Sequence, residues 1–259
     1  MKKKGNNYNH KLPDIKKLKN LYFDKTMSAS DISKRYNVTL GAVLIKFKRY
    51  NVKRRTLIEA QELIANHIEL TNSQKEFIEG LLIGDGCIYP TKLKKSAAYS
   101  HTDKHREYIE WLIDEFTKQK IICCGVKIYS GTNCFTMKTK HYREFIKLRQ
   151  RWYPNNKKQI PIDYQITPIG LFNWYIGDGS YHKYTNRKSG GEKVVLCSQF
   201  DQCGKKRLSL QLIDIGINNS VYQDSIYIKA ESRKIFFKYM LKHKYSIPNC
   251  YKYKFPKED

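Results

Sequence analysis

Acidic side chains are scarce in this sequence relative to basic ones. Its 259 residues include 24 Asp and Glu against 49 Lys and Arg, so the formal net charge at pH 7 is +25. A charge excess of this size predicts a polyanionic partner for the protein. Nucleic acid is the first candidate for that partner, and an anionic membrane surface is the second.

Long apolar segments are also missing. The longest uninterrupted apolar runs are far too short to span a bilayer, and the lysine-rich start has no apolar signal region. The seven cysteines include no C-x-x-C pair that is matched by a second such pair. These absences predict an intracellular protein in a reducing compartment (cytoplasm or organelle matrix), with no membrane partner and no structural zinc.

Common catalytic signatures are absent as well. His101, His105 and His141 lack the spacing of nucleases that place histidine and asparagine on a zinc-bound finger. No serine or cysteine lies in a nucleophile motif, and the sequence has no P-loop. The hydrophobic content of 41% nevertheless supports a packed core, and the length allows one large domain or two to three small ones.

Two apolar runs that each end in Gly-Asp-Gly are the most informative feature of the chain. They span residues 77–86 and 171–179. The first follows an S-x-x-E capping box at residues 73–76, and the second follows Thr167 and Pro168, a cap residue and a proline suited to a first turn. Both runs therefore predict helices, each ended by a glycine that can adopt the left-handed conformation.

The first run also carries glycine inside the predicted helix. Gly80 and Gly84 lie four residues apart, on one helix face, although each costs about 1 kcal/mol relative to alanine. Such a face predicts close packing between the two helices through small residues. Parallel packing would bring Asp85 and Asp178 together, where their mutual repulsion requires a divalent cation. The backbone carbonyls of Gly84 and Gly177 could add ligands to that cation.

The two runs resemble the paired motifs of the LAGLIDADG homing endonucleases, in the single-chain form that carries two motifs. Residues 78–86 and 171–179 fill the nine-letter motif, and its acidic eighth letter falls on Asp85 and Asp178. The resemblance extends over about residues 73–256. It implies that both aspartates hold Mg²⁺ (or Mn²⁺). It also implies site-specific hydrolysis of both strands of double-stranded DNA at a long, nearly asymmetric target.

Further site residues follow from the resemblance. In the family a lysine follows the last helix of each half, which points to Lys158 in the first half. In the second half, counting from the leading proline favours Lys252, and the Tyr-Lys-Phe ending favours Lys254, which we take as the catalytic lysine. The alternative for either is a basic surface tail. The third motif letter, usually small, is Gly80 in the first copy and Asn173 in the second.

The predicted fold class is α+β, with two pseudo-symmetric halves of α-β-β-α-β-β-α order that form a DNA-binding saddle. A small all-α helix-turn-helix domain precedes them, and the whole is expected to be a monomer with internal pseudo-twofold symmetry. The predicted boundaries are 1–70 for the basic N-terminal region and its linker helix, 71–160 for the first half and 161–259 for the second. Predicted helices include residues 57–70, 106–118 and 140–152.

Residues 15–50 carry the pattern of a helix-turn-helix. Asn37 can supply a left-handed turn residue and Thr39 can cap a further helix, so residues 39–50 are the candidate recognition helix. The alternative is a small helical spacer with a solvated basic face. The exposed face and exit of this helix carry six cations: Lys46, Lys48, Arg49, Lys53, Arg54 and Arg55.

The strands and loops of the two halves supply the other candidate DNA contacts. For any single lysine the alternative is a solvated surface charge. The basic candidates are Lys92, Lys94, Lys138, Lys183, Arg187, Lys188, Lys193 and Lys229. The candidates for base edges are Tyr89, Asn133, Gln199 and Gln223.

Two other functions are compatible with the same scaffold. A DNA-binding transcriptional regulator would keep the fold without cutting, although the retention of both Asp85 and Asp178 argues against it. An intron maturase would instead bind its own structured intron RNA. Both alternatives share the basic surface, so charge alone does not separate them from the nuclease.

Overall fold

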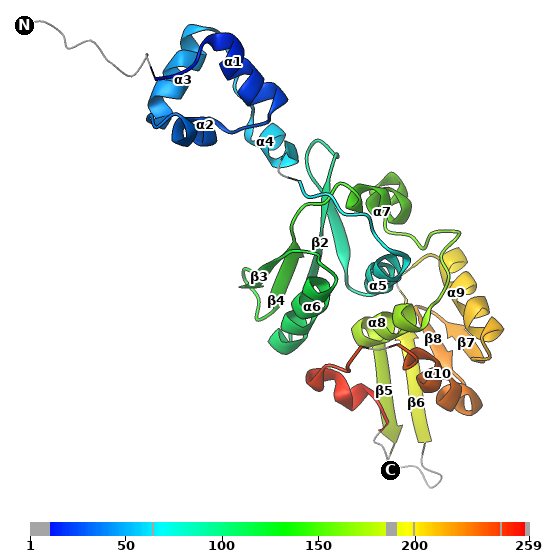
Figure 1. The fold of residues 1–259 in the computed structure, drawn as a ribbon. Helices are drawn as coiled ribbons and strands as arrows, with labels where there is room; N and C mark the ends of the chain where they lie inside the picture. The colour runs from blue at the N-terminus through cyan, green and yellow to red at the C-terminus, as the bar shows by residue number, and fades with distance from the viewer. Residues whose placement is uncertain (1–10, 64, 185–190, 199, 244, 257–259) are drawn as a thin grey trace, which may run out of the picture. The chain divides into compact units, whose positions relative to one another are not determined.

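The structure is a computed structural model that describes residues 11–63, 65–184, 191–198, 200–243 and 245–256 (Figure 1). The chain divides into two compact units, residues 1–64 and 65–259. The domain boundaries predicted at residues 70 and 160 stay predictions. No helix within the described ranges combines the length and the apolar character needed to cross a bilayer.

The N-terminal unit consists of short helices around a small apolar core. Leu18, Ile32, Val43 and Phe47 are fully buried in this core. Its elements are α1 (Ile15–Lys19), the π-helix η2 (Asn20–Asp24), α2 (Ala29–Arg35), α3 (Leu40–Arg49) and α4 (Leu57–Leu63).

Short polar side chains set the ends of α2 and α3. Ser28 and Asp31 form a capping box at the start of α2. Asn37 has a φ of 49°, which turns the chain between the helices. The Thr39 hydroxyl accepts a hydrogen bond from the Ala42 amide at 3.2 Å and caps α3. The predicted turn residue and cap are thus confirmed.

The prediction of one helix over residues 57–70 is wrong at its C-terminal end. Helix α4 stops at Leu63. Asn66 then forms an isolated β-bridge: its amide donates to the His141 carbonyl at 2.8 Å, and its carbonyl accepts from the Arg143 amide at 3.2 Å. Backbone groups that pair with a distant segment cannot also make the hydrogen bonds of a helix.

Residues 65–259 contain two halves with the same order of elements, and the predicted α-β-β-α-β-β-α order is confirmed (Figure 1). The first half contains α5 (Asn72–Ile83), β1 (Cys87–Pro90), β2 (Ala97–Asp103), α6 (Arg106–Lys118), β3 (Cys123–Ile128), β4 (Phe135–Thr139) and α7 (Phe145–Trp152). The second contains α8 (Pro168–Asp178), β5 (Gly179–Tyr184), β6 (Gly191–Cys197), α9 (Gln202–Asp214), β7 (Asn219–Tyr222), β8 (Ser225–Ile228) and α10 (Arg233–Met240).

Each half has one four-stranded antiparallel sheet. The strand orders are β1-β2-β4-β3 and β5-β6-β8-β7, so two hairpins pair through their inner strands. Ser100 lies opposite Cys87 and Lys138, and Val195 lies opposite Tyr227. Because side chains alternate along a strand, these residues lie on one face of each sheet, while their neighbours face the helices.

The structure confirms one predicted helix and moves the start of another. Helix α6 spans Arg106–Lys118, as predicted. Helix α7 begins at Phe145 and not at residue 140, because Tyr142 and Ala97 exchange backbone hydrogen bonds of 2.8 and 3.0 Å. This short bridge extends the sheet before the helix can start.

The capping box of α5 also differs from the prediction. The cap residue is Thr71, whose hydroxyl accepts from the Gln74 amide at 3.2 Å. The Gln74 side chain accepts in return from the Thr71 amide at 2.7 Å. A T-x-x-Q box at residues 71–74 therefore replaces the predicted S-x-x-E box two residues later.

Helices α5 and α8 lie side by side at the centre of the second unit (Figure 1). Every residue of α5 from Phe77 to Ile83 is buried, and so is every residue of α8 from Ile169 to Ile176. A single apolar core surrounds them and joins both halves. The packing of the two central helices therefore brings the C-terminal ends of the two motifs close together.

The glycines that follow these helices do not adopt the predicted left-handed conformation. Gly84 has a φ of −81° and Gly179 a φ of −87°. Lack of space explains glycine at positions 86 and 179 instead. A Cβ atom on Gly86 would lie 2.5 Å from the Tyr99 hydroxyl, and one on Gly179 would clash with the Tyr175 ring.

Candidate active site

Small residues allow α5 and α8 to approach each other closely. A Cβ atom on Gly80 would lie 2.6 Å from the Gly170 Cα atom and 3.2 Å from the Asn173 Cβ atom. Any larger residue at position 80 would push the helices apart. The small partner on α8 is therefore Gly170, one turn before the third motif letter at Asn173.

Asn173 makes a polar contact across this interface. Its side chain is 1% exposed, and its amide nitrogen donates to the Phe77 carbonyl at 2.9 Å. Within the described part of the chain, its Oδ1 atom has no hydrogen-bond partner. The amide therefore fixes α8 against the backbone of α5 at a position where the motif usually has a small residue.

The structure brings the carboxylates of Asp85 and Asp178 together at the ends of α5 and α8. A Cβ atom on Gly177 would lie 4.0 Å from Asp85 Oδ2, and one on Gly84 would lie 3.8 Å from Asp178 Oδ2. Each carboxylate thus reaches the backbone of the other helix. Asp85 is exposed and Asp178 is half-buried. Burial and then the Asp85 charge raise the pKa of Asp178 to about 7.

A lysine holds the end of each helix. The Lys158 ammonium donates to the carbonyls of Gly84 and Gly86 at 2.7 and 2.9 Å. The Lys254 ammonium donates to the carbonyls of Ile176 and Gly177 at 2.5 and 3.2 Å. The two lysines thus occupy equivalent places in the two halves.

Lys254 rather than Lys252 lies next to the carboxylates. Lys254 is 6% exposed, whereas Lys252 is exposed to solvent. Burial lowers the pKa of Lys158, and it lowers that of Lys254 to about 8, against the opposing effect of the Asp178 charge. Two carboxyl groups and two ammonium groups therefore lie in one partly desolvated cluster.

The donor set fits a hard divalent cation that keeps part of its shell for water and substrate. Two carboxylates are available, and Mg²⁺ typically binds through one or two carboxylates together with phosphate oxygens and water. Among the described residues, no group of three or more His, Cys, Asp or Glu side chains could hold a metal. The Gly84 and Gly177 carbonyls already accept from lysines, so each offers one remaining lone pair. Their role as ligands stays a prediction.

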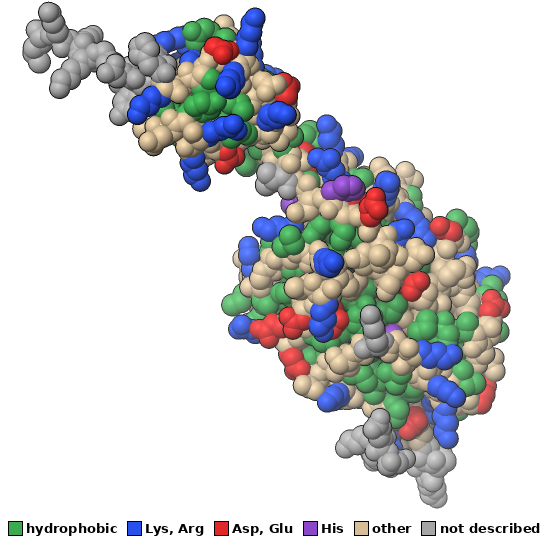
Figure 2. All heavy atoms as spheres, viewed as in Figure 1, with side chains coloured by type: hydrophobic (Ala, Val, Ile, Leu, Met, Phe, Trp, Pro, Cys, Tyr) green, Lys and Arg blue, Asp and Glu red, His purple; other side chains and the backbone are tan. Residues whose placement is uncertain are grey.

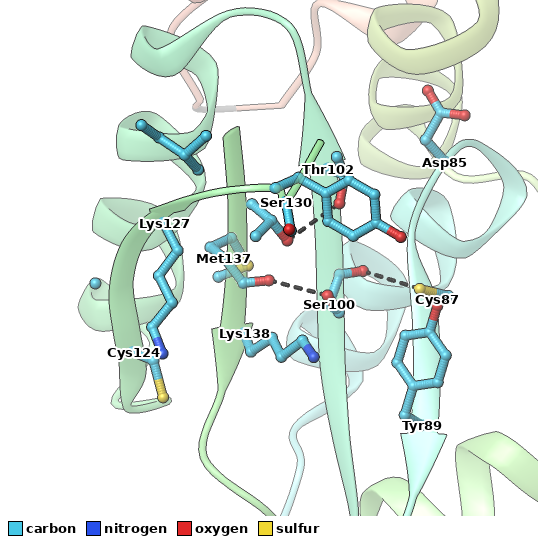
Figure 3. A pocket seen from close by; sticks show the side chains of 14 residues that line it. Asp85, Cys87, Tyr89, Ser100, Thr102, Cys124, Lys127, Ser130, Met137 and Lys138 are labelled. Atoms are coloured by element: carbon cyan, nitrogen blue, oxygen red, sulfur yellow. Dashed lines mark hydrogen bonds between the residues drawn. The ribbon is translucent and has the colours of Figure 1, made fainter. Parts of the chain in front are cut away.

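The open face of the first sheet forms a hollow of about 700 Å³ next to the carboxylates (Figure 3). Asp85 lies at its edge, and Cys87, Ser100 and Lys138 line it together with Tyr89. The Lys138 ammonium lies 5.8 Å from the centre of the Tyr89 ring. Both predicted contact residues, Tyr89 and Lys138, are therefore on the open face.

The open face of the second sheet has a different arrangement. Alternation along β5 places His182 on this face and Lys183 on the opposite one, with Tyr181, which packs on the core. The Lys193 ammonium lies 4.8 Å from the centre of the Tyr227 ring. His182 and Tyr227 were missed in the sequence, although alternation along the strand puts His182 on the same face as Ser180, two residues earlier.

The remaining predicted contacts of the second unit lie around the sheets. Lys92 and Lys94 are exposed between β1 and β2, and Lys229 is exposed after β8. Gln223 is exposed in the turn between β7 and β8, with a φ of 48°. Asn133 is exposed between β3 and β4. Three predicted contacts fall outside the described residues: Arg187, Lys188 and Gln199.

The six cations predicted on the N-terminal unit divide into two groups. Lys46 donates to the carbonyls of Leu12 and Pro13, and Arg55 donates to those of Tyr22 and Met27, so both hold the unit together. The other four are exposed: Lys48, Arg49, Lys53 and Arg54. Figure 2 shows Lys and Arg side chains over the visible face of each unit.

Comparison with known proteins adds three observations on the sequence. The LAGLIDADG DNA endonuclease family matches residues 75–246. The uncharacterized protein MJ1098 of Methanocaldococcus jannaschii is 31% identical over 129 residues, 45% of this chain and 47% of that protein, so the chain spans about half of its length. A probable intron-encoded endonuclease of Wickerhamomyces canadensis is 28% identical over 201 residues, 71% of this chain and 84% of that protein.

A solved structure shares the fold. The homing endonuclease I-WcaI, bound to its DNA recognition sequence, is 24% identical with a TM-score of 0.60. The match covers 78% of this chain and 92% of that one. The predicted α+β fold with paired halves is thereby confirmed.

Proposed function

The chain belongs to the LAGLIDADG DNA endonuclease family, and from this we propose that it is a site-specific homing endonuclease that hydrolyses both strands of double-stranded DNA. The observation that carries the proposal is the meeting of Asp85 and Asp178 at the ends of two packed helices, each beside a lysine. We further propose an intron as the host element, since the Wickerhamomyces canadensis relative is described as intron-encoded.

Asp85 and Asp178 are the residues that would hold Mg²⁺ or Mn²⁺. When bound, such a cation would supply charge neutralisation for the phosphoryl oxygens and would activate a water as nucleophile. The exposed carboxylate of Asp85 leaves the site open to the scissile phosphate. The half-buried carboxylate of Asp178 forms the inner wall of the site.

Lys158 and Lys254 would act on the substrate through their remaining N–H groups. Each ammonium has three N–H groups, and two of them are used by carbonyls at the helix end. The third can donate to the attacking water or to the charge that develops on the phosphate. Because both lysines are tethered, this donor is already oriented before DNA binds.

The two sheets would bind the two halves of an asymmetric target. In the first sheet the tyrosine is on β1 and the lysine on β4, as Tyr89 and Lys138. In the second sheet the lysine is on β6 and the tyrosine on β8, as Lys193 and Tyr227. The lysine and the tyrosine therefore occupy different strands in the two sheets. Each sheet would present its donor and its aromatic ring at different positions along the duplex, which favours different half-sites.

We propose that the N-terminal unit is a helix-turn-helix that extends the DNA contact. Its α2 and α3 are joined by a short turn at Asn37, and exposed cations gather at the end of α3 and beyond it, including Lys48, Arg49 and Arg54. These side chains are suited to phosphate contacts, which strengthen binding without reading sequence.

The test is cleavage of a randomised DNA library with purified protein. The proposal predicts a small set of cut sequences with Mg²⁺ and none when the metal is chelated. Asp178→Asn should bind DNA without cutting it, while Asp214→Asn, at an exposed carboxylate at the end of α9, should cut normally. A wild-type protein that binds specific DNA but cuts none would instead identify a DNA-binding regulator.

A further inference from the structure

The lysine of the second half is attached to the first half. Lys254 ends η5 (Asn249–Lys254), a 3-10 helix near the end of the described chain. We propose that Asp103, at the end of β2, is a positioning residue that sets the place of the Lys254 ammonium through Tyr251. This inference rests on the proposed function, because it assigns the control of one residue of that same site.

The connection begins with a hydrogen bond between the halves. The Tyr251 hydroxyl donates to Asp103 Oδ2, and the other oxygen, Oδ1, accepts from the His105 amide at 2.6 Å. Asp103 is itself held in the sheet opposite Phe135. A carboxylate with both oxygens occupied and a backbone fixed by strand pairing is a rigid acceptor.

The Tyr251 ring is also buried against aromatic side chains of the first half. The side chain is 4% exposed and contacts the rings of Tyr108 and His105 edge-on, at centroid distances of 5.1 and 5.2 Å. The backbone of the same segment is also bound to the first half, since the Asn249 amide donates to Glu107 Oε1 at 3.1 Å. The start of η5 therefore belongs structurally to the first half.

The Lys254 side chain lies directly on this anchored tyrosine. Its ammonium is 4.7 Å from the centre of the Tyr251 ring, and it donates to the Ile176 carbonyl of α8. The Tyr175 hydroxyl of α8 donates to the Lys254 carbonyl. The lysine is thus held between a ring fixed by the first half and a helix end of the second.

Strand β2 also carries residues of the proposed DNA surface. Ser100 and Thr102 line the hollow of the first sheet, and Asp103 is the next residue along the strand. The sheet that would receive one half of the target therefore connects, through two side chains, to the lysine of the other half. Lys158 has its two carbonyl partners in its own half. The ring of the second half that lies near its ammonium, Phe200 at 5.9 Å, has no hydroxyl through which a carboxylate could hold it.

Amine labelling of the metal-free protein without DNA tests this arrangement. Acetylation by a limiting amine-reactive reagent, read by mass spectrometry, reports the accessibility of each lysine. Tyr251→Phe and Asp103→Asn should each raise the labelling of Lys254 severalfold. Lys158 and Lys205, which is 3% exposed in α9, should keep the labelling of the parent protein.

Tyr108→Phe is the matched control. Its hydroxyl is buried and has no hydrogen-bond partner among the described residues, so the variant removes a hydroxyl from the same cluster without removing a bond. Its Lys254 labelling should equal that of the parent protein. Equal labelling of Lys254 in Tyr251→Phe and the parent would overturn the proposal, and so would a rise at all three lysines, which reports general loosening.

Cleavage supplies an independent readout. Displacement of Lys254 should lower kcat by as much as about 100-fold while the KM for DNA stays unchanged, because misplacing a catalytic group affects the chemical step. A parent protein that cuts no DNA would refute the proposed function, yet the labelling would still decide the position of Lys254. A rise in KM with unchanged kcat would assign Asp103 to DNA binding instead.

Discussion

Gly80 on α5 lies against Gly170 on α8 with no space for a methyl group between them. This contact sets the distance between the helices and hence the distance between the carboxylates at their ends. Alanine at position 80 gains about 1 kcal/mol of helix propensity but forces apart a tightly packed interface.

Gly80→Ala should lower the free energy of unfolding by about 1–2 kcal/mol, since overpacking outweighs the propensity gain. Cleavage should fall much further, because the two carboxylates separate. Gly41→Ala is the control, since a Cβ atom there would have only the Thr39 hydroxyl at 3.8 Å, and it should be neutral or stabilising. Chemical denaturation and cleavage rates measure both effects, and a fully active Gly80→Ala variant would contradict the close packing.

The pKa of Asp178 makes stability depend on pH in the metal-free protein. Its pKa is about 7 in the folded chain against an ordinary value of 3.8, so the folded state binds this proton more tightly than the unfolded state. The stability from this group is complete below pH 3.8 and is lost as the pH rises through about 7. Asp178→Asn should therefore stabilise the protein, by on the order of 2 kcal/mol more at pH 8 than at pH 5.

Thermal unfolding at both pH values, with a chelator present, measures this difference. Asp214→Asn, at an exposed carboxylate, should show no such pH dependence. Mg²⁺ should stabilise the parent protein at pH 8 and have little effect on Asp178→Asn. A variant that is less stable than its parent at pH 8 would show that the carboxylate is not under strain from burial and repulsion.

Lys254→Met and Lys252→Met should behave differently although they are two residues apart. Lys254 is buried and donates to the end of α8, whereas Lys252 is exposed. The first variant should lose about 10²–10³-fold in kcat, as expected for the loss of one preorganised donor, and keep its DNA affinity. The second should keep the parent kcat. Single-turnover cleavage at saturating DNA measures both, and the reverse result would assign the catalytic role to Lys252.

Two adjacent arginines of the N-terminal unit should have different roles, one in DNA binding and the other in the stability of the unit. Arg54 is exposed, and Arg54→Ala should reduce the slope of log affinity against log salt by about 1. Arg55 donates to the carbonyls of Tyr22 and Met27, so Arg55→Ala should destabilise this unit by about 2 kcal/mol. Salt titrations of DNA binding and hydrogen exchange within residues 11–63 measure the two effects. An unchanged salt slope for Arg54→Ala would argue that this unit does not contact DNA.

Local patterns explain why much of the fold was predictable. Helix α6 has an apolar side, and its predicted bounds agree with the structure. The ends of α4 and α7 were wrong because backbone pairing between distant segments, at Asn66 and Tyr142, competes with helix formation. No local sequence signal encodes such pairing.

The site residues likewise divide into those that a local sequence signal marks and those that only the packing of distant segments reveals. Asp85 and Asp178 were found because each ends a recognisable motif. Lys158 was found because the segment after the last helix of the first half resembles that of the family. His182 was missed because the strand was judged by its charges rather than by its alternation. The contact between Asp103 and Tyr251 joins residues 148 positions apart, and only the packed halves reveal it.

The hydrogen bond from Asn173 to the Phe77 carbonyl has a consequence for how such proteins can be recombined. A symmetric dimer made from two copies of the first half would place Gly80 in both third positions, and neither copy would supply the crossing amide. The contact is therefore asymmetric: the second half supplies the amide, and the first half supplies only a backbone carbonyl. A chimaera that keeps Asn173 should keep this hydrogen bond, whereas one that replaces the second half should keep it only if the incoming helix carries an amide at position 173.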